Sequence, residues 1–238
     1  MLIQVAMNGD RSRSEHPAIP ITPAELAADA AACWAAGARS VHFHPRRVGD
    51  ERESLGAEAL DAAVAAVRAA VPGLEISCST QEDIDLGGAA SRVEAIRLWS
   101  QPPDLVSLNL VQDDAVPLGT ALLERGVGIE AGVFSVADAE ALLAAPWAAR
   151  VHRVLVEILD EEDDGDAAVA QAREVDALVA PLGRPRLWHA QGRATWAVVG
   201  AARALGLDVR VGFEDVLAGR DGRPAVSNAE QVRDVLAL

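Results

Sequence analysis

An α/β fold, in the form of a single (β/α)8 TIM barrel, is predicted by three features of the amino-acid sequence. The 238 residues suit one α/β domain, and 50% of them are hydrophobic, so a large core can be buried. Short apolar runs typical of strands alternate with alanine-rich runs typical of helices. This alternation occurs eight times with short connections, so we expect one barrel domain over residues 1–238.

The eight predicted strands are short apolar runs, as expected for parallel strands that are buried on both faces. Each run is bounded by Gly, Pro or polar residues, which end strands. In chain order the predicted strands span 2–7, 40–44, 74–79, 104–110, 127–132, 151–159, 184–190 and 207–215.

A helix is predicted after each strand, and the first has the clearest boundary signals. Thr22 is the expected N-cap, Pro23 the first helical residue, Glu25 completes a capping box, and Gly37 ends the helix. Ser135 is expected to cap the fifth helix. In chain order the predicted helices span 22–37, 55–73, 87–100, 117–126, 135–146, 167–183, 193–206 and 227–238.

A doubly wound open sheet is the alternative architecture. Such sheets usually have fewer strands and often a Gly-rich first turn, and neither feature is present. The acidic run at 160–166 is predicted to be a solvated loop. Gly87 and Gly88 open a predicted helix and could cradle a phosphate, but a plain turn is the preferred interpretation.

The formal net charge of −15 argues against a nucleic acid or an anionic membrane as partner. All 21 basic residues are arginines, because the sequence contains no lysine. Schiff-base catalysis through a lysine is therefore excluded. Any carbonyl chemistry must use a metal ion, a hydrogen-bond donor or a bound cofactor.

The two cysteines, Cys33 and Cys78, are not spaced as a metal-binding or redox pair. No run approaches the ~18 apolar residues that span a bilayer. The first ten residues lack the basic region of a signal peptide. A reducing, cytoplasmic location is the resulting expectation.

Polar residues gather at the carboxyl end of every predicted strand, where TIM-barrel enzymes carry their active sites. Buried polar atoms need partners, so a site at the barrel mouth explains them better than core packing. In strand order they are Asn8, Gly9 and Asp10; His42, His44, Arg46 and Arg47; Ser77, Ser79 and Thr80; Ser107 and Asn109; Glu130; Glu157; His189; and Arg210, Glu214 and Asp215.

The motif VHFHPRR at 41–47 predicts a metal site. Residues i and i+2 of a strand point to the same face, so His42 and His44 can direct both rings at one point. Two imidazoles suit Zn²⁺ or another borderline divalent ion, and Glu214 is the best candidate for a third ligand. Three protein ligands leave a position open for substrate, as in catalytic sites. Ordinary hydrogen-bonded structural roles for both histidines are the alternative.

Several segments together resemble the β-keto acid cleavage enzymes, whose type activity is 3-keto-5-aminohexanoate cleavage. IPITPAELAADAAACWAAGARSVHFHPR (19–46) resembles that family's Pro-x-Thr-Pro-x-Glu helix followed by His-x-His-x-Arg. GVGIEAGVF (126–134) resembles its Gly-Val-x-x-Glu strand, and VRVGFED (209–215) its Arg-x-Gly-x-Glu-Asp motif. The pair SN (227–228) resembles the opening of its last helix. The resemblance spans nearly the whole chain.

The sequence departs from the family pattern at two places near the expected site. Arg47 stands where the family often has Asp. SCSTQED replaces the expected Thr-Gly-Gly after the third strand, so either Ser77 or Ser79 could face the substrate. These departures concern the choice of substrate more than the chemistry.

The resemblance implies a TIM-barrel transferase, often a homotetramer, that binds Zn²⁺ through His42, His44 and Glu214. Its reaction is a retro-Claisen-type cleavage in which a small β-keto acid and acetyl-CoA, a CoA thioester co-substrate, give acetoacetate and a new acyl-CoA. We expect Asp215 to act as the base, Arg210 to pair bidentately with the substrate carboxylate, and Glu130 to orient substrate or share proton transfer. The expected substrate-binding residues are Ser77, Ser79, Ser107, Asn109, Asp10, Arg46 and His189, of which His189 could bind metal instead.

Two other functions are compatible with a metal-binding barrel. Metal-dependent hydrolases often carry His-x-His on the first strand and sometimes a modified lysine, whereas here the motif is on the second strand and lysine is absent. A non-catalytic barrel that kept the metal is the second alternative. An assay of acyl-CoA formation against simple hydrolysis separates the three.

Overall fold

The structure is a computed structural model that describes residues 1–81, 84, 88–159 and 164–238. Eight parallel strands pair in sequence order, and the last pairs with the first, so the sheet closes into a barrel. The strands are β1 (Ile3–Ala6), β2 (Ser40–Phe43), β3 (Glu75–Ser79), β4 (Leu105–Asn109), β5 (Gly128–Val133), β6 (Arg153–Leu159), β7 (Arg186–Gln191) and β8 (Asp208–Val211).

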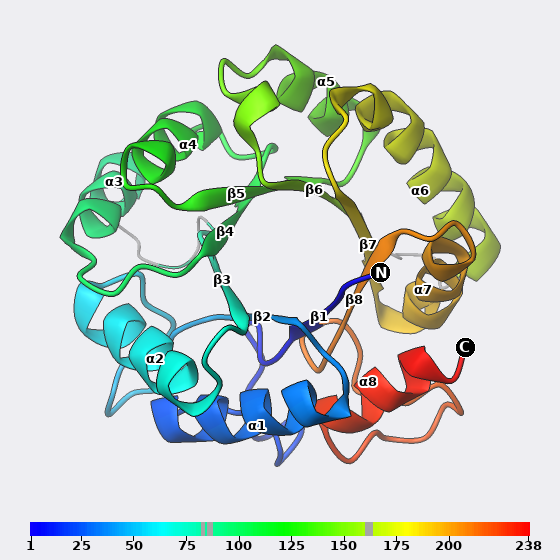
Figure 1. The fold of residues 1–238 in the computed structure, drawn as a ribbon, viewed down its shortest axis with the longest axis horizontal. Helices are drawn as coiled ribbons and strands as arrows, with labels where there is room; N and C mark the ends of the chain where they lie inside the picture. Colours follow the sequence, from blue (N-terminus) through cyan, green and yellow to red (C-terminus); the bar gives the residue numbers. More distant parts are fainter. Residues whose placement is uncertain (82–83, 85–87, 160–163) are drawn as a thin grey trace.

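A ring of α-helices surrounds the barrel, one following each strand (Figure 1). The first and last helices pack side by side and complete the ring. This closed architecture confirms the predicted TIM barrel and excludes the open sheet. The helices are α1 (Pro23–Ala36), α2 (Ala57–Ala70), α3 (Gly88–Leu98), α4 (Ala115–Glu124), α5 (Val136–Ala144), α6 (Gly165–Val179), α7 (Thr195–Ala204) and α8 (Asn228–Leu236).

The predicted helix signals act as expected. Thr22 and Glu25 form the capping box of α1, with Pro23 in the first turn. Gly37 follows α1 with φ = 122°, a conformation that favours glycine. The Ser135 side chain accepts from the Asp138 amide at the start of α5. These caps satisfy amides that the helices leave unpaired.

Apolar packing between the strands and the helix ring forms the main core. Phe43, Leu60 and Trp188 are each fully buried in it. Burying such a side chain stabilises the fold by roughly 1.5–3 kcal/mol. The barrel also buries polar and charged side chains, including Gln4 and Glu130, both 0% exposed. These groups need hydrogen-bond partners inside the protein. Their hydrogen bonds connect the barrel interior to the candidate site.

Strand β8 is shorter than the sequence predicts. The expected strand covered 207–215, but β8 ends at Val211. A Cβ atom at Gly212 would lie 1.9 Å from the carbonyl oxygen of Ala6, so only glycine permits this approach to β1. The chain then turns, and the Asp215 amide donates to the Gly212 carbonyl at 3.0 Å. Glu214 and Asp215 therefore lie on a loop.

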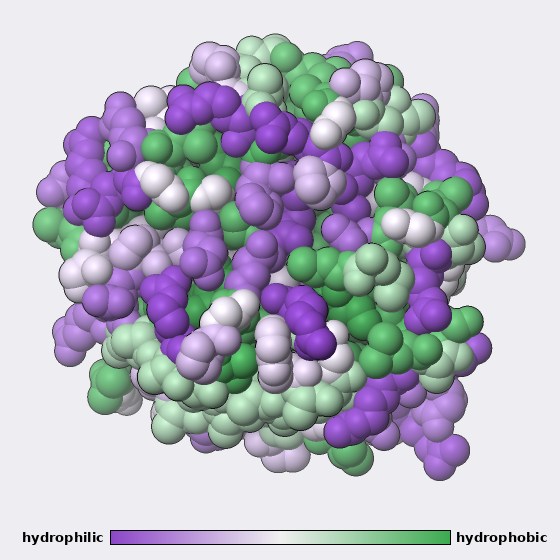
Figure 2. Space-filling view, viewed as in Figure 1, coloured by the Kyte–Doolittle hydropathy of each residue, from purple (hydrophilic) through white to green (hydrophobic). Residues whose placement is uncertain are grey.

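The acidic run at 160–166 includes residues 160–163, and the proposed phosphate cradle includes residue 87. These residues lie outside the described part of the chain. Among the described residues, no helix has the length and apolar character needed to cross a membrane. Hydrophilic and hydrophobic residues are interspersed over the face seen in Figure 2.

Candidate metal centre and active site

His42 on β2 and His44, one residue beyond the strand, turn their rings toward the same point. The ring centroids lie 5.4 Å apart at an interplanar angle of 79°. His42 Nδ1 lies 3.1 Å from Ser77 Oγ, and His44 Nδ1 pairs with the Glu53 carboxylate. Each histidine is thus held through Nδ1, which leaves Nε2 for a ligand.

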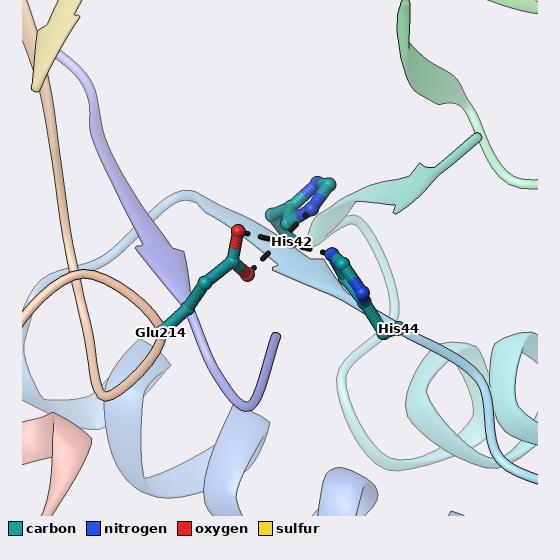
Figure 3. A group of neighbouring side chains, drawn as sticks. All are labelled: His42, His44 and Glu214. Carbon is teal, nitrogen blue, oxygen red and sulfur yellow. Dashed lines mark ion pairs between the residues drawn. The ribbon is translucent and has the colours of Figure 1, made fainter. Parts of the chain in front are cut away.

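Glu214 reaches the two histidines from the loop after β8 (Figure 3). Its Oε2 lies 3.7 Å from His42 Nε2, and its Oε1 lies 3.8 Å from His44 Nε2. One ligand atom from each residue falls within a cluster no wider than 4.8 Å. This is close to the spacing of roughly 3.4 Å between ligands that tetrahedral zinc requires.

The donor set fits a divalent metal ion. Glu214 Oε2 is buried and accepts no hydrogen bond within the described residues, although a carboxylate oxygen in a low dielectric needs a partner. Burial, followed by the Arg210 charge, holds the pKa of His42 well below its usual value, so the ring is neutral. A neutral imidazole with a free Nε2 is the form that binds metal.

Arg210, on β8, contacts both Glu214 of the candidate metal site and Asp215, which belongs to a second group of charged residues. Its Nη2 donates to Glu214 Oε1 at 2.5 Å and to Asp215 Oδ1 at 2.8 Å, and its Nε donates to Asp215 Oδ2 at 3.2 Å. The Nε and Nη2 atoms of Arg210, which could have paired bidentately with a substrate carboxylate as expected, therefore pair with Asp215 instead. Only Nη1 makes none of these contacts.

Asp215 is fully buried and lies between Arg210 and His189. Burial favours the protonated carboxyl group, but the Arg210 and His189 charges outweigh it and hold the pKa of Asp215 well below its usual value. Burial and Arg210 lower the pKa of His189, whereas Asp215 and Glu157 raise it, with a net rise to about 9. His189 lies 3.3 Å from Asp215 and 3.4 Å from Glu157.

Glu130 lies inside the barrel, enclosed by neighbouring strands. Its Oε1 accepts from Gln4 Nε2 at 2.8 Å and lies 2.8 Å from Arg153 Nε. Its Oε2 accepts from the Ser77 hydroxyl group. Both oxygens of Glu130 therefore have partners. Ser77 links this carboxylate to the candidate metal site, because Ser77 also contacts His42.

Strands β3 and β4 place three further predicted residues near the barrel mouth. Ser79, at the end of β3, pairs in register with Ser107, and both are buried. Within the described part of the chain, Ser79 Oγ accepts only from the Gln81 amide, at 3.2 Å, whereas Ser77 Oγ has two partners. Asn109 ends β4, and its side chain occupies the space beside Gly132 where a Cβ atom would otherwise lie. The structure thus leaves Ser79 freer than Ser77 to meet a substrate.

Asp10 and Arg46 occupy different surroundings from one another. Asp10 is exposed after β1, and its side chain makes no hydrogen bond or ion pair within the described residues. Arg46 is half-buried and donates to the carbonyl oxygens of Gly9 and Arg11. Its guanidinium group is therefore used to hold the loop after β1.

Three residues of the network were assigned no catalytic, binding or metal-ligating role from the sequence. Asn8 donates to the His44 carbonyl and accepts from the His44 amide, at 3.0 and 2.9 Å. Glu53 lies in a loop where no motif marks it. Arg153 begins β6, at the end of the barrel remote from the mouth, so its position in the sequence gave no reason to assign it to the site. Asn8 carried a signal, because it directly follows the strand region of β1.

A model of one protein family, described as beta-keto acid cleavage enzyme, matches residues 1–238. The chain belongs to that family. The 3-keto-5-aminohexanoate cleavage enzyme of Fusobacterium nucleatum subsp. nucleatum is 26% identical over 261 residues, covering 100% of this chain and 90% of the relative. The enzyme of the same name from Acetoanaerobium sticklandii is 25% identical over 258 residues, with 100% and 91% coverage. The predicted membership of a family of β-keto acid cleavage enzymes is confirmed.

Solved structures of ObcA share the fold. The ternary complex of ObcA with a C4-CoA adduct and oxalate matches with a TM-score of 0.77 at 21% identity, covering 93% of this chain and 63% of that chain. The binary complex of ObcA with oxaloacetate matches with a TM-score of 0.76 at the same identity. The present chain thus spans less than two thirds of ObcA.

Proposed function

We propose that the protein is a zinc-dependent transferase that cleaves a small β-keto acid with acetyl-CoA, giving acetoacetate and a new acyl-CoA. The observation that carries this proposal is the convergence of His42, His44 and Glu214 at the mouth, beside the buried Arg210–Asp215 pair. Membership of the beta-keto acid cleavage enzyme family and the CoA adduct held by ObcA support the choice of reactants.

His42, His44 and Glu214 would hold the metal, which would act as a Lewis acid toward the keto oxygen of the substrate. Other divalent ions that accept nitrogen and oxygen ligands suit the same residues. Because three protein ligands are present, a fourth position stays available to the substrate.

Asp215 is proposed as the group that accepts the acidic α-proton of the keto acid. The low pKa of its carboxyl group keeps it ionised at neutral pH. Arg210 holds both carboxylate oxygens, so the base has a defined orientation. The remaining Nη1 of Arg210 can donate to the substrate carboxylate, in a single contact rather than a bidentate one.

Donors around the mouth are proposed to bind the reacting carbonyl groups. Ser79 ends β3, Ser107 and Asn109 lie on the adjacent β4, and all three carry hydroxyl or amide donors. His189 is proposed to act through Asp215, which it contacts, rather than on substrate. Asp10, exposed near the mouth, is available for a substrate side chain.

A screen of small β-keto acids with acetyl-CoA, read by mass spectrometry, tests the reaction. We expect acetoacetate and a new acyl-CoA to form in equal amounts and only with metal-loaded protein. Hydrolysis without acyl-CoA would indicate a metal-dependent hydrolase instead. Metal binding without turnover of any keto acid would indicate a binding barrel. A homotetramer and a cytoplasmic location also stay predictions, testable by light scattering and by cell fractionation.

A further inference from the structure

A chain of buried hydrogen bonds runs from the barrel interior to His42. Ser77 Oγ lies 3.1 Å from His42 Nδ1 and also bonds Glu130 Oε2. Ser77, Glu130 and the His42 ring are all buried to at least 99%, so water cannot replace these partners. A serine hydroxyl has one proton, so it can donate to only one of its two neighbours.

The surroundings of Glu130 decide where that proton goes. Arg153 Nε lies 2.8 Å from Oε1, and Gln4 Nε2 donates to the same oxygen at 2.8 Å. Arg153 is itself 2% exposed, so the ion pair is screened from solvent. A carboxylate paired with a guanidinium group only accepts hydrogen bonds. Ser77 must therefore donate to Glu130 and accept from His42.

We propose that Glu130 is a positioning residue that sets the tautomer of His42 through Ser77. The neutral His42 ring carries a single N–H, and Ser77 accepts it at Nδ1. The lone pair is then on Nε2, the atom that lies 3.7 Å from Glu214 Oε2. The role of this tautomer in metal binding rests on the proposed function. The tautomer itself does not, because it can be observed without metal.

Glu130→Gln is the sharpest test, because the structure predicts how the amide would be oriented. Gln4 and Arg153 both face Oε1, so the amide oxygen would stay there. The NH2 group would then face Ser77 and donate to it. Ser77 would donate to His42 Nδ1, and the ring proton would move to Nε2, which could no longer bind metal.

The tautomer can be read in metal-free protein labelled with ¹⁵N- and ¹³C-histidine. The chain has only five histidines, and a His42→Asn variant assigns the relevant signals. We expect the His42 proton on Nδ1 in the wild type and on Nε2 in Glu130→Gln. Magic-angle-spinning spectra make the measurement independent of the size of the assembly.

Glu75→Gln is the matched control, since Glu75 is the other carboxylate that Arg153 contacts but has no contact with Ser77. It should keep the wild-type tautomer. Zinc affinity, measured by chelator competition, should fall by ~10–100-fold in Glu130→Gln and stay unchanged in Glu75→Gln. In a Ser77→Ala background, Glu130→Gln should have no further effect on His42.

A His42 proton on Nε2 in the wild type, or an unchanged tautomer in Glu130→Gln, would overturn the inference. An equal change in Glu75→Gln would overturn it too, because the effect would be a general response to lost charge. If Glu130→Gln does not fold, Ser77→Ala decides: retention of the wild-type preference for Nδ1–H contradicts the relay. A correct tautomer in a protein that binds no zinc would refute the proposed metal function alone.

Discussion

His42 and His44 are separated by one residue, yet the two rings are supported by different parts of the molecule. His42 is held from inside the barrel by Ser77, which is fully buried on β3. His44 is held by Glu53, whose side chain is 18% exposed in the loop between β2 and α2. The candidate metal centre thus has a strand-supported half and a loop-supported half.

Glu214 belongs to the loop-supported half. The preceding amide, of Phe213, donates at 2.7 Å to Asn228, which α8 presents toward the loop. Asn228 in turn donates to Asp29 on α1 at 2.7 Å. Water can replace the partly exposed Glu53 beside His44 but not Ser77 inside the barrel, so the supports of the two histidines should respond differently to the loss of a hydrogen bond.

The largest effect is expected where both halves meet, at the metal itself. The double variant His42→Ala, His44→Ala removes two of three ligands, so zinc content should fall from about one ion per chain to near zero. Elemental analysis of purified protein measures this directly, with His152→Ala as a control at a histidine outside the cluster. Equal zinc in wild type and double variant would place the metal elsewhere.

Replacing the proposed base should separate metal binding from chemistry. Asp215→Asn keeps one acceptor oxygen for Arg210 but removes the proton acceptor, so the rate should fall ~10²–10⁴-fold with zinc retained. Exchange of substrate α-hydrogens in deuterated water, followed by NMR, should slow in parallel. Exchange at the wild-type rate would show that a different group takes the proton.

Asp29 accepts from Asn228, which holds the loop that carries Glu214. Titration of Asp29 should therefore make the stability of the protein depend on pH. Burial raises the pKa of Asp29 to about 6, against hydrogen bonds from Asn228 and Cys33 that lower it. Because this lies above its ordinary value of 3.8, the contribution of Asp29 to stability is fully present below pH ~3.8 and is lost as pH rises through about 6. The decline corresponds to at most about 3 kcal/mol.

Asp29→Asn keeps an acceptor for Asn228 and should remove this decline. Urea unfolding of the metal-free protein at pH 4 and pH 7, compared between wild type and variant, measures the difference. Asp10→Asn, at an exposed position, is the matched control. The same pH dependence in Asp29→Asn and wild type would contradict the assignment.

The smallest effect on zinc affinity is expected from replacing Glu53. It tests directly whether the support of His44 matters less than the support of His42. Glu53→Ala should weaken zinc binding only about tenfold, at the low end for a group behind a metal ligand, because Glu53 is 18% exposed and water can take its place beside His44 Nδ1. Ser77→Ala should weaken it more. Chelator competition compares the two variants, with Glu58→Ala as a control on the nearby α2. A larger loss from Glu53→Ala would reverse the proposed order.

Local patterns in the sequence were sufficient for the eight βα units and for part of the site. Strand and helix periods, together with the caps at Thr22 and Ser135, depend on neighbouring residues only, so they could be predicted. The common direction of His42 and His44 follows from their i, i+2 spacing in the same way. The strand ends marked the mouth because parallel strands in a barrel all end there.

Only the tertiary structure decided which groups support each ligand. The end of β8 at Val211 depends on the approach of Gly212 to the backbone of β1, so the loop carrying Glu214 could not be predicted from its own residues. The contacts of Ser77 with His42 and Glu130 span 35 and 53 positions, and they depend on the register of neighbouring strands. Closing the barrel pairs β8 with β1, which also pairs with β2, and this long-range pairing places Glu214 at the two histidines.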